Sequence, residues 1–274
     1  MNIFVSSIIR DIFQVESVSY WVDSLNEPNI GVELLAFTHN DSYWKKLCGV
    51  LKKLRCPVSF HGPYIGIEGT SAPGTEDERR LMESYRQVFL LAREYGVRHV
   101  VYHTTQFRFS PGELEKMRAL AERNVSAILS MAEESGVNVL IENLPYPPSF
   151  RKNSGPVDKA PLYTNEEYGS FFTKYPEVNS IIDIGHANIN GMDLSEFLQQ
   201  HGERVKAYHF HNNDGVHDLH NDMYNGTFSY SDFAPLYRRY TPRSDVVLEY
   251  DPHVELDDKA LLSHIDYVLS NFAS

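Results

Sequence analysis

Eight short apolar segments alternate with longer amphipathic ones along the 274 residues of the chain. Most of these short segments are nearly continuous runs of apolar residues rich in Val and Ile, which is typical of parallel strands buried on both faces. We therefore predict strands at 2–6, 30–36, 58–61, 99–103, 138–142, 180–184, 205–211 and 246–250. This repeated pattern constrains the fold more than any other feature of the sequence.

The segments between the strands have helical signals. The clearest helix is predicted over 75–95, because Thr75 and Glu78 resemble a capping box at its start and Gly96 follows its end. A second long helix is predicted over 112–135, between Pro111 and Gly136. Shorter helices are predicted over 41–54, 165–175, 194–201, 230–240 and 257–272.

Strand–helix alternation without a break in composition predicts an α/β protein, a single (β/α)8 TIM barrel forming one domain over 1–274. A doubly wound open sheet is the alternative, but no Gly-x-Gly-x-x-Gly motif follows the first strand. The Pro-rich segment 144–166 departs from the rhythm. Such a long loop is either a lid over a site or a stiff surface excursion.

Composition limits the classes of function. The chain has only two cysteines and no apolar run near the ~20 residues of a membrane span, and its first residues lack the basic region of a signal peptide. We therefore expect a cytoplasmic protein without membrane partners. The net charge of −12 disfavours nucleic acid as a partner, although a basic groove assembled from separate loops stays open. An oligomer is compatible with the sequence.

Imidazoles and carboxylates gather at the predicted carboxyl ends of six consecutive strands, where TIM barrels carry their sites. Glu142, Asp183 and Glu249 each follow apolar residues, and a carboxylate buried there is costly without compensation. Few lysines or arginines are close to them in sequence, so divalent cations are the expected partners. Histidine and carboxylate donors without cysteine suit Zn²⁺, Mn²⁺, Fe²⁺ or Co²⁺ better than Ca²⁺ or Mg²⁺.

Other polar and aromatic residues near these strand ends have two readings each. His209 lies two residues before His211 and faces the same side of its strand, so we expect it deeper in the barrel in a structural role. Glu33 either contacts a substrate hydroxyl or forms a structural ion pair. Tyr64, Phe107 and Tyr146 are predicted to form an apolar wall beside the site. The other histidines are read as surface or structural residues, His217 with less weight.

Several motifs resemble the xylose isomerase-like TIM-barrel superfamily over nearly the whole chain. These are GVEL at 31–34, FHGP at 60–63, IEN at 141–143, IDIGHAN at 182–188, HFHNNDG at 209–215 and LE at 248–249. The superfamily groups isomerases and epimerases of sugars and sugar phosphates with apurinic-site nucleases of the endonuclease IV type. The resemblance therefore implies two chemistries.

In the epimerase branch, the resemblance implies one metal ion held by Glu142, Asp183, His211 and Glu249. The two glutamates would then exchange a proton with the substrate carbon while the metal stabilises an enediolate. His186 would contact a substrate oxygen. In the 144–166 loop, Arg151 and Lys152 are predicted to contact a phosphate or carboxylate of the substrate.

In the endonuclease IV branch, nine ligands hold three metal ions for phosphodiester hydrolysis. Every ligand type has a match in this chain, but the expected loops contain only scattered basic residues. We therefore expect an isomerase or epimerase of a sugar, sugar acid or sugar phosphate with one to three ions, and phosphodiester cleavage of abasic DNA or a small molecule is the alternative. The nine matching residues are His61, His103, Glu142, Asp183, His186, His211, Asp218, His220 and Glu249.

Overall fold

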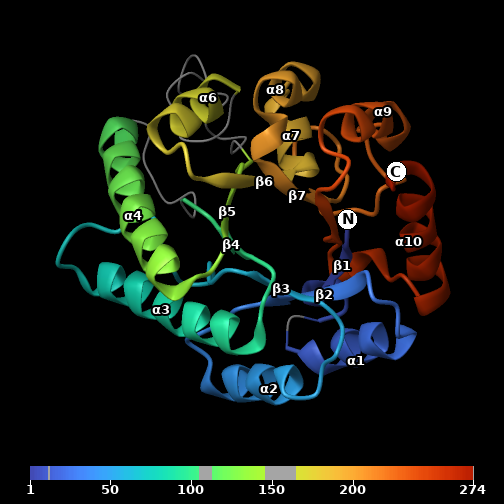
Figure 1. The fold of residues 1–274 in the computed structure, drawn as a ribbon, viewed down its shortest axis with the longest axis horizontal. Coiled ribbons are helices and arrows are strands. Elements are labelled where there is room, and N and C mark those ends of the chain that lie inside the picture. Colours follow the sequence, from blue (N-terminus) through green and yellow to red (C-terminus); the bar gives the residue numbers. More distant parts are fainter. Residues whose placement is uncertain (12, 105–112, 146–164, 274) are drawn as a thin grey trace.

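A computed structural model describes residues 1–11, 13–104, 113–145 and 165–273. Eight parallel strands follow one another around a closed barrel, and β1 pairs with β8 to complete it. The helices form a ring outside the strands (Figure 1). The predicted (β/α)8 barrel is confirmed. The strands are β1 (Ile3–Ser6), β2 (Ile30–Leu35), β3 (Val58–His61), β4 (Val100–Tyr102), β5 (Val139–Glu142), β6 (Asn179–Asp183), β7 (Val205–Phe210) and β8 (Asp245–Leu248).

The helices agree with the sequence pattern except at two places. The predicted capping signals of α3 are present, since Thr75 accepts the backbone N–H of Glu78 and Gly96 ends the helix with a φ of 63°. The sequence pattern missed α1, whose start at Gln14 has no side-chain cap, and α7, which is only 7 residues long. The helices are α1 (Val15–Leu25), α2 (Asp41–Leu51), α3 (Glu76–Tyr95), α4 (Leu114–Ser135), α6 (Asn165–Lys174), α7 (Ile184–Asn190), α8 (Leu194–His201), α9 (Tyr230–Tyr240) and α10 (Asp258–Phe272), with 3₁₀ turns at Ser7–Ile9, Gly202–Arg204 and Pro252–Val254.

None of the helices in the described parts of the chain combines the length and the apolar character that crossing a bilayer requires.

Inside the barrel, a small apolar cluster lies below a polar layer. The period of two along a strand places every second side chain on the inner face. Each of the six residues of the cluster therefore has a polar residue two positions further along the chain, at or next to the carboxyl end of the strand. The cluster consists of Phe4, Val101, Leu140, Ile181, Ala207 and Val247, and the polar residues that follow on the inner face are Ser6, His103, Glu142, Asp183, His209 and Glu249.

Asp245 stabilises the opposite end of the barrel, where the strands begin. Its buried carboxylate accepts the backbone N–H of Asn2 at 2.7 Å and pairs with Arg98, which precedes β4. We expect Asp245→Ala to lower the free energy of unfolding by about 2 kcal/mol, because it leaves that N–H unpaired and removes a half-exposed ion pair. Urea denaturation measures the change, and the exposed Asp266→Ala should stay within about 0.5 kcal/mol of wild type. Equal stabilities of the two variants would contradict this role.

Candidate metal centre

The structure gathers the nine predicted ligands at one mouth of the barrel, where the strands end and the following loops begin. Six stand at or just after the last residue of β3 to β8, one on each strand, and three come from α7 and from the loop after β7. Their ligand atoms form overlapping groups within 4.8 Å of one another. The six are His61, His103, Glu142, Asp183, His211 and Glu249, and the other three are His186, Asp218 and His220.

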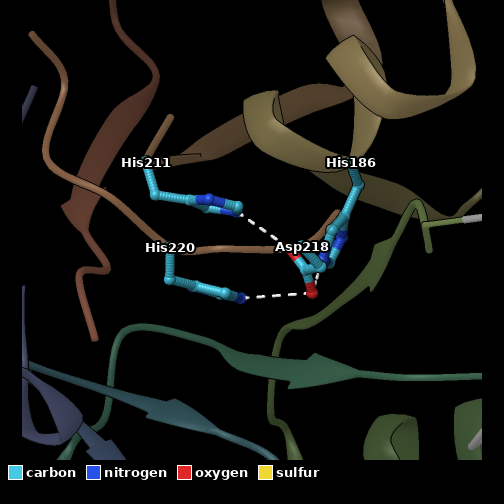
Figure 2. A group of neighbouring side chains, drawn as sticks. All are labelled: His186, His211, Asp218 and His220. Atoms are coloured by element: carbon cyan, nitrogen blue, oxygen red, sulfur yellow. Dashed lines mark hydrogen bonds and ion pairs between the residues drawn. The ribbon is translucent and has the colours of Figure 1, made fainter. Parts of the chain in front are cut away.

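The loop after β7 folds back over the barrel mouth because a backbone bridge closes it. The N–H groups of Asn212 and Asn221 each donate to the carbonyl of the other residue at 2.9 Å. His220 takes a positive φ of 47°, and its ring stacks on that of His211 with 3.8 Å between the centroids. Figure 2 shows both rings directed at Asp218. The bridge therefore brings loop ligands to a strand-end ligand.

Asp183 ends β6 and also caps α7, so that the strand passes directly into the helix that carries His186. Its carboxylate accepts the backbone N–H of His186 at 2.6 Å, and Nε2 of His211 lies 2.9 Å from both of its oxygens. The Asn143 side chain accepts the N–H of Asp183 at 2.7 Å and donates to its carbonyl at 2.9 Å. A side chain at Gly185 would overlap the His211 ring. This corner therefore requires glycine at 185.

A hydrogen bond from Nδ1 to a backbone carbonyl orients three of the histidines. Nδ1 lies 3.1 Å from a backbone carbonyl oxygen in His61, 2.8 Å in His186 and 3.0 Å in His220. A carbonyl only accepts, so each Nδ1 carries a hydrogen, and in the neutral ring Nε2 then presents a lone pair. For His186 and His220, Nε2 faces Asp218 at 3.2 and 3.4 Å, a repulsive arrangement unless a proton or a cation lies between the atoms. Histidines that bind metals are held in this way by their second nitrogen.

The two glutamates of the centre have pKa values displaced in opposite directions. Burial alone would raise the pKa of Glu142, but the imidazoles of His103 and His209 lower it well below the usual range. Burial raises the pKa of Glu249 to about 8, and the neighbouring Glu142 and Asp183 carboxylates add to that effect. Without a bound cation, these shifts favour the ionised form of Glu142 and the protonated form of Glu249 at neutral pH. Pairs of titratable groups with separated pKa values are typical of sites that carry out acid–base chemistry.

The donor set fits a divalent cation. In the described part of the chain, every ion pair of the four buried or half-buried carboxylates is with a histidine, and none is with a lysine or arginine. Imidazole and carboxylate donors without thiolate match first-row ions such as Zn²⁺. Three of the candidate groups are His61, His103 and Glu142; His186, His211, Asp218 and His220; and Asp183, His211 and Glu249, and the other two include the deeper His209.

Comparison with known proteins identifies the family of this barrel. A family model described as a xylose isomerase-like TIM barrel matches residues 28–260. The chain belongs to this family. The resemblance that the sequence motifs indicated is thereby confirmed.

Solved structures similar to this xylose isomerase-like barrel include a D-tagatose 3-epimerase-like protein, with 17% identity, a TM-score of 0.72 and full coverage of both chains. The 3-keto-D-glucoside 4-epimerase of E. coli has 16% identity and a TM-score of 0.71 over 98% of this chain and 99% of its own. A protein named IOLI, solved with a bound zinc atom, has 12% identity and a TM-score of 0.73 over both full chains. At these identities the likeness shows the fold alone. No curated protein matches the sequence.

Below the ligands of this xylose isomerase-like barrel lies a second polar level. His209 is fully buried, and its Nε2 lies 3.0 Å from Oε1 of Glu33. Ser59 donates to the other oxygen of Glu33 at 3.1 Å. Burial alone would raise the pKa of Glu33, but His209 holds it below the usual range. This position favours the structural ion pair for Glu33 over contact with a substrate hydroxyl.

The remaining predicted site residues divide into two groups. Tyr64 lies beside the centre, with its ring 4.9 Å from that of His61 and 5.4 Å from that of His103. His217 is exposed and bonds to Asp214 rather than to the cluster. The others, and most of the Pro-rich segment, lie outside the described residues. These are Phe107, Tyr146, Arg151 and Lys152.

Sequence reasoning missed the residues that position the ligands. Asn143 and Gly185 are examples described above, and Asn213 is another, since it donates to the Gly185 carbonyl at 2.8 Å and accepts from Asn188 at 2.8 Å. All of them lie within the IEN, IDIGHAN and HFHNNDG motifs. The motifs therefore contained these residues, but their function of positioning the ligands is visible only from contacts between strands that are distant in sequence.

Proposed function

We propose that the protein is a divalent-metal-dependent isomerase or epimerase of a sugar, sugar acid or sugar phosphate. The observation that carries this proposal is the pair Glu142 and Glu249. Both are buried at the mouth of the barrel, they approach the same Nδ1 atom of His209 at 3.4 and 3.3 Å, and their pKa values are displaced in opposite directions. Epimerisation requires one group to remove a proton and another to return it.

In the proposed reaction, the ionised Glu142 takes the proton from the substrate carbon next to a carbonyl. Glu249 returns a proton to the opposite face of that carbon in epimerisation. In isomerisation the proton goes to the neighbouring carbon, and the hydroxyl proton passes to the oxygen of the former carbonyl. When bound, a divalent cation supplies Lewis acidity to the carbonyl, and Asp183, His211 and the two glutamates would hold it. We place His186 against a substrate oxygen.

The names of similar structures support this choice. Two of them are described as a sugar epimerase or as an epimerase-like protein, and a third was solved with zinc. We infer a small carbohydrate as substrate. Cys48 and Cys56 are both free thiols, which supports a reducing compartment such as the cytoplasm.

A second candidate is phosphodiester cleavage. The observation that favours it is the number of ligand groups, because His61, His103 and Glu142 form one set and His186, Asp218 and His220 belong to another. A single ion would require only Asp183, His211, Glu249 and the residues next to them. A centre with two or three ions would suit a substrate with a phosphodiester, since several cations can hold the attacking and leaving oxygens together.

Metal counting and hydrogen exchange test the proposal in one experiment. We expect protein loaded with Mn²⁺, Co²⁺ or Zn²⁺ to incorporate deuterium from D₂O into a ketose, ketose phosphate or keto acid at the carbon next to the carbonyl. Proton NMR of a panel of such sugars measures the exchange, and mass spectrometry counts the ions per chain. Chelation should abolish the exchange and added metal should restore it.

A different set of results would favour phosphodiester cleavage. If no sugar in the panel exchanges while a duplex with an abasic site or bis(p-nitrophenyl) phosphate is cleaved with two or three ions per chain, the second candidate replaces the first.

A further inference from the structure

His209 stands between the two glutamates at the floor of the metal centre. Its Nδ1 lies 3.4 Å from Oε1 of Glu142, 3.3 Å from Oε2 of Glu249 and 3.7 Å from Oδ2 of Asp183. The ring is fully buried, and within the described chain Nδ1 forms no hydrogen bond of good geometry. Any change in the position of this ring therefore changes the space available to three ligand carboxylates at once.

The other side of the ring is fixed. Nε2 of His209 donates to Glu33 at 3.0 Å, and Glu33 is itself fully buried on β2, across the barrel from β7. Ser59 on β3 donates to the second oxygen of Glu33 at 3.1 Å, and Nε2 of His99 lies 3.8 Å from that same oxygen. The Glu33 carboxylate thus has a hydrogen-bond partner on each oxygen, His209 from β7 and Ser59 from β3, and these two contacts set its position.

We propose that Glu33 and His209 form a positioning pair for the metal centre: Glu33 fixes the His209 ring, and its Nδ1 sets the spacing of Glu142 and Glu249. This inference rests on the metal dependence in the proposed function. Carboxylates that orient histidines near a metal commonly change its affinity by roughly 10–100-fold when they are replaced. Here the carboxylate and the histidine together act on the ligands from below.

Two substitutions of the histidine separate its two contacts. The amide nitrogen of a glutamine overlays Nε2 of a histidine, so His209→Gln keeps a donor toward Glu33 and loses the group between the glutamates. An asparagine amide overlays Nδ1, so His209→Asn keeps a polar group at the glutamates and loses the contact with Glu33. Glu33→Gln keeps the volume of the carboxylate and removes its charge. The exposed Glu134→Gln on α4 is the matched control.

Cobalt binding is the readout, because the visible spectrum of Co²⁺ reports the arrangement of its ligands independently of turnover. We expect Glu33→Gln and His209→Gln each to weaken Co²⁺ binding roughly 10–100-fold and to alter its spectrum, with His209→Asn less affected than His209→Gln. The double variant Glu33→Gln/His209→Gln should bind no more weakly than the worse single variant, since the two residues act through one another. Circular dichroism of the metal-free proteins checks folding.

A folded Glu33→Gln protein with the affinity and spectrum of wild type would overturn the inference. Fully additive losses in the double variant would also overturn it. If wild-type protein itself bound no Co²⁺, the proposed function would fail rather than the pair alone, so the two failures are distinguishable.

Discussion

Replacing either Glu142 or Glu249 with glutamine abolishes deuterium exchange into the substrate, as we expect from the proposed mechanism. Glutamine keeps an oxygen that can bind a metal but neither removes nor supplies a proton at neutral pH. Proton transfer by a positioned side chain contributes about 10²- to 10⁴-fold, and a loss of at least ~10³-fold is expected for each variant. Exchange into the sugar, followed by NMR at saturating metal, measures the effect.

The two variants should differ in a second respect. Because Glu142 is ionised and Glu249 protonated at neutral pH, Glu249→Gln removes little charge from the metal-free centre, whereas Glu142→Gln removes a full negative charge. The first should therefore lose less metal affinity than the second. Glu134→Gln on the surface of α4 serves as control and should keep full activity. Exchange that persists in both glutamine variants would refute the proposed acid–base roles.

Gly185→Ala should lose metal binding although it changes no ligand. A Cβ at this position would overlap the ring of His211, which is fully buried and has no room to retreat. We expect the ring to leave Asp183 and the Zn²⁺ affinity to fall by ~100-fold, similar to the loss caused by disturbing other groups that orient ligands. Overpacking should also cost about 1–3 kcal/mol of stability. Competition with a chromophoric chelator measures the affinity, and urea denaturation measures the stability.

Gly49→Ala is the matched control, because Gly49 lies in α2 with no atom near the position of the added methyl. It should bind metal as wild type does and gain about 0.5–1 kcal/mol of stability. If Gly185→Ala does not fold, the double variant Gly185→Ala/His211→Ala gives the answer, since removing the ring makes room. It should be as stable as His211→Ala alone. Wild-type Zn²⁺ affinity in a folded Gly185→Ala protein would contradict the packing argument.

Much of the fold was predictable because its signals are local. Each strand is a short apolar run, and α3 is capped by Thr75 and Gly96 through hydrogen bonds within a few residues. The failures have local causes as well. Helix α1 begins without a side-chain cap, and the N-cap of α7 is Asp183, the last residue of a strand. A helix capped by a candidate metal ligand carries no separate start signal.

The candidate ligands were predictable for a different reason. In a barrel, the carboxyl ends of all strands meet at one mouth, so a polar residue after an apolar run is placed by topology alone. This argument predicted that Glu142, Asp183 and Glu249 lie together, without any knowledge of distances. It also placed His209 one step deeper than His211, through the period of two along a strand.

The contacts that each of these residues makes were decided only by the tertiary structure. Glu33 and His209 are 176 positions apart, and their 3.0 Å contact exists because β2 and β7 face one another across the barrel. The same holds for Gly185, whose lack of a side chain matters only because the His211 ring lies against it. Sequence by itself determined the barrel and the candidate ligands at its mouth, since strand periodicity and the topology of a barrel place both. Packing between distant strands decided the orientation of each ligand, because that orientation depends on atoms that sequence spacing does not bring together.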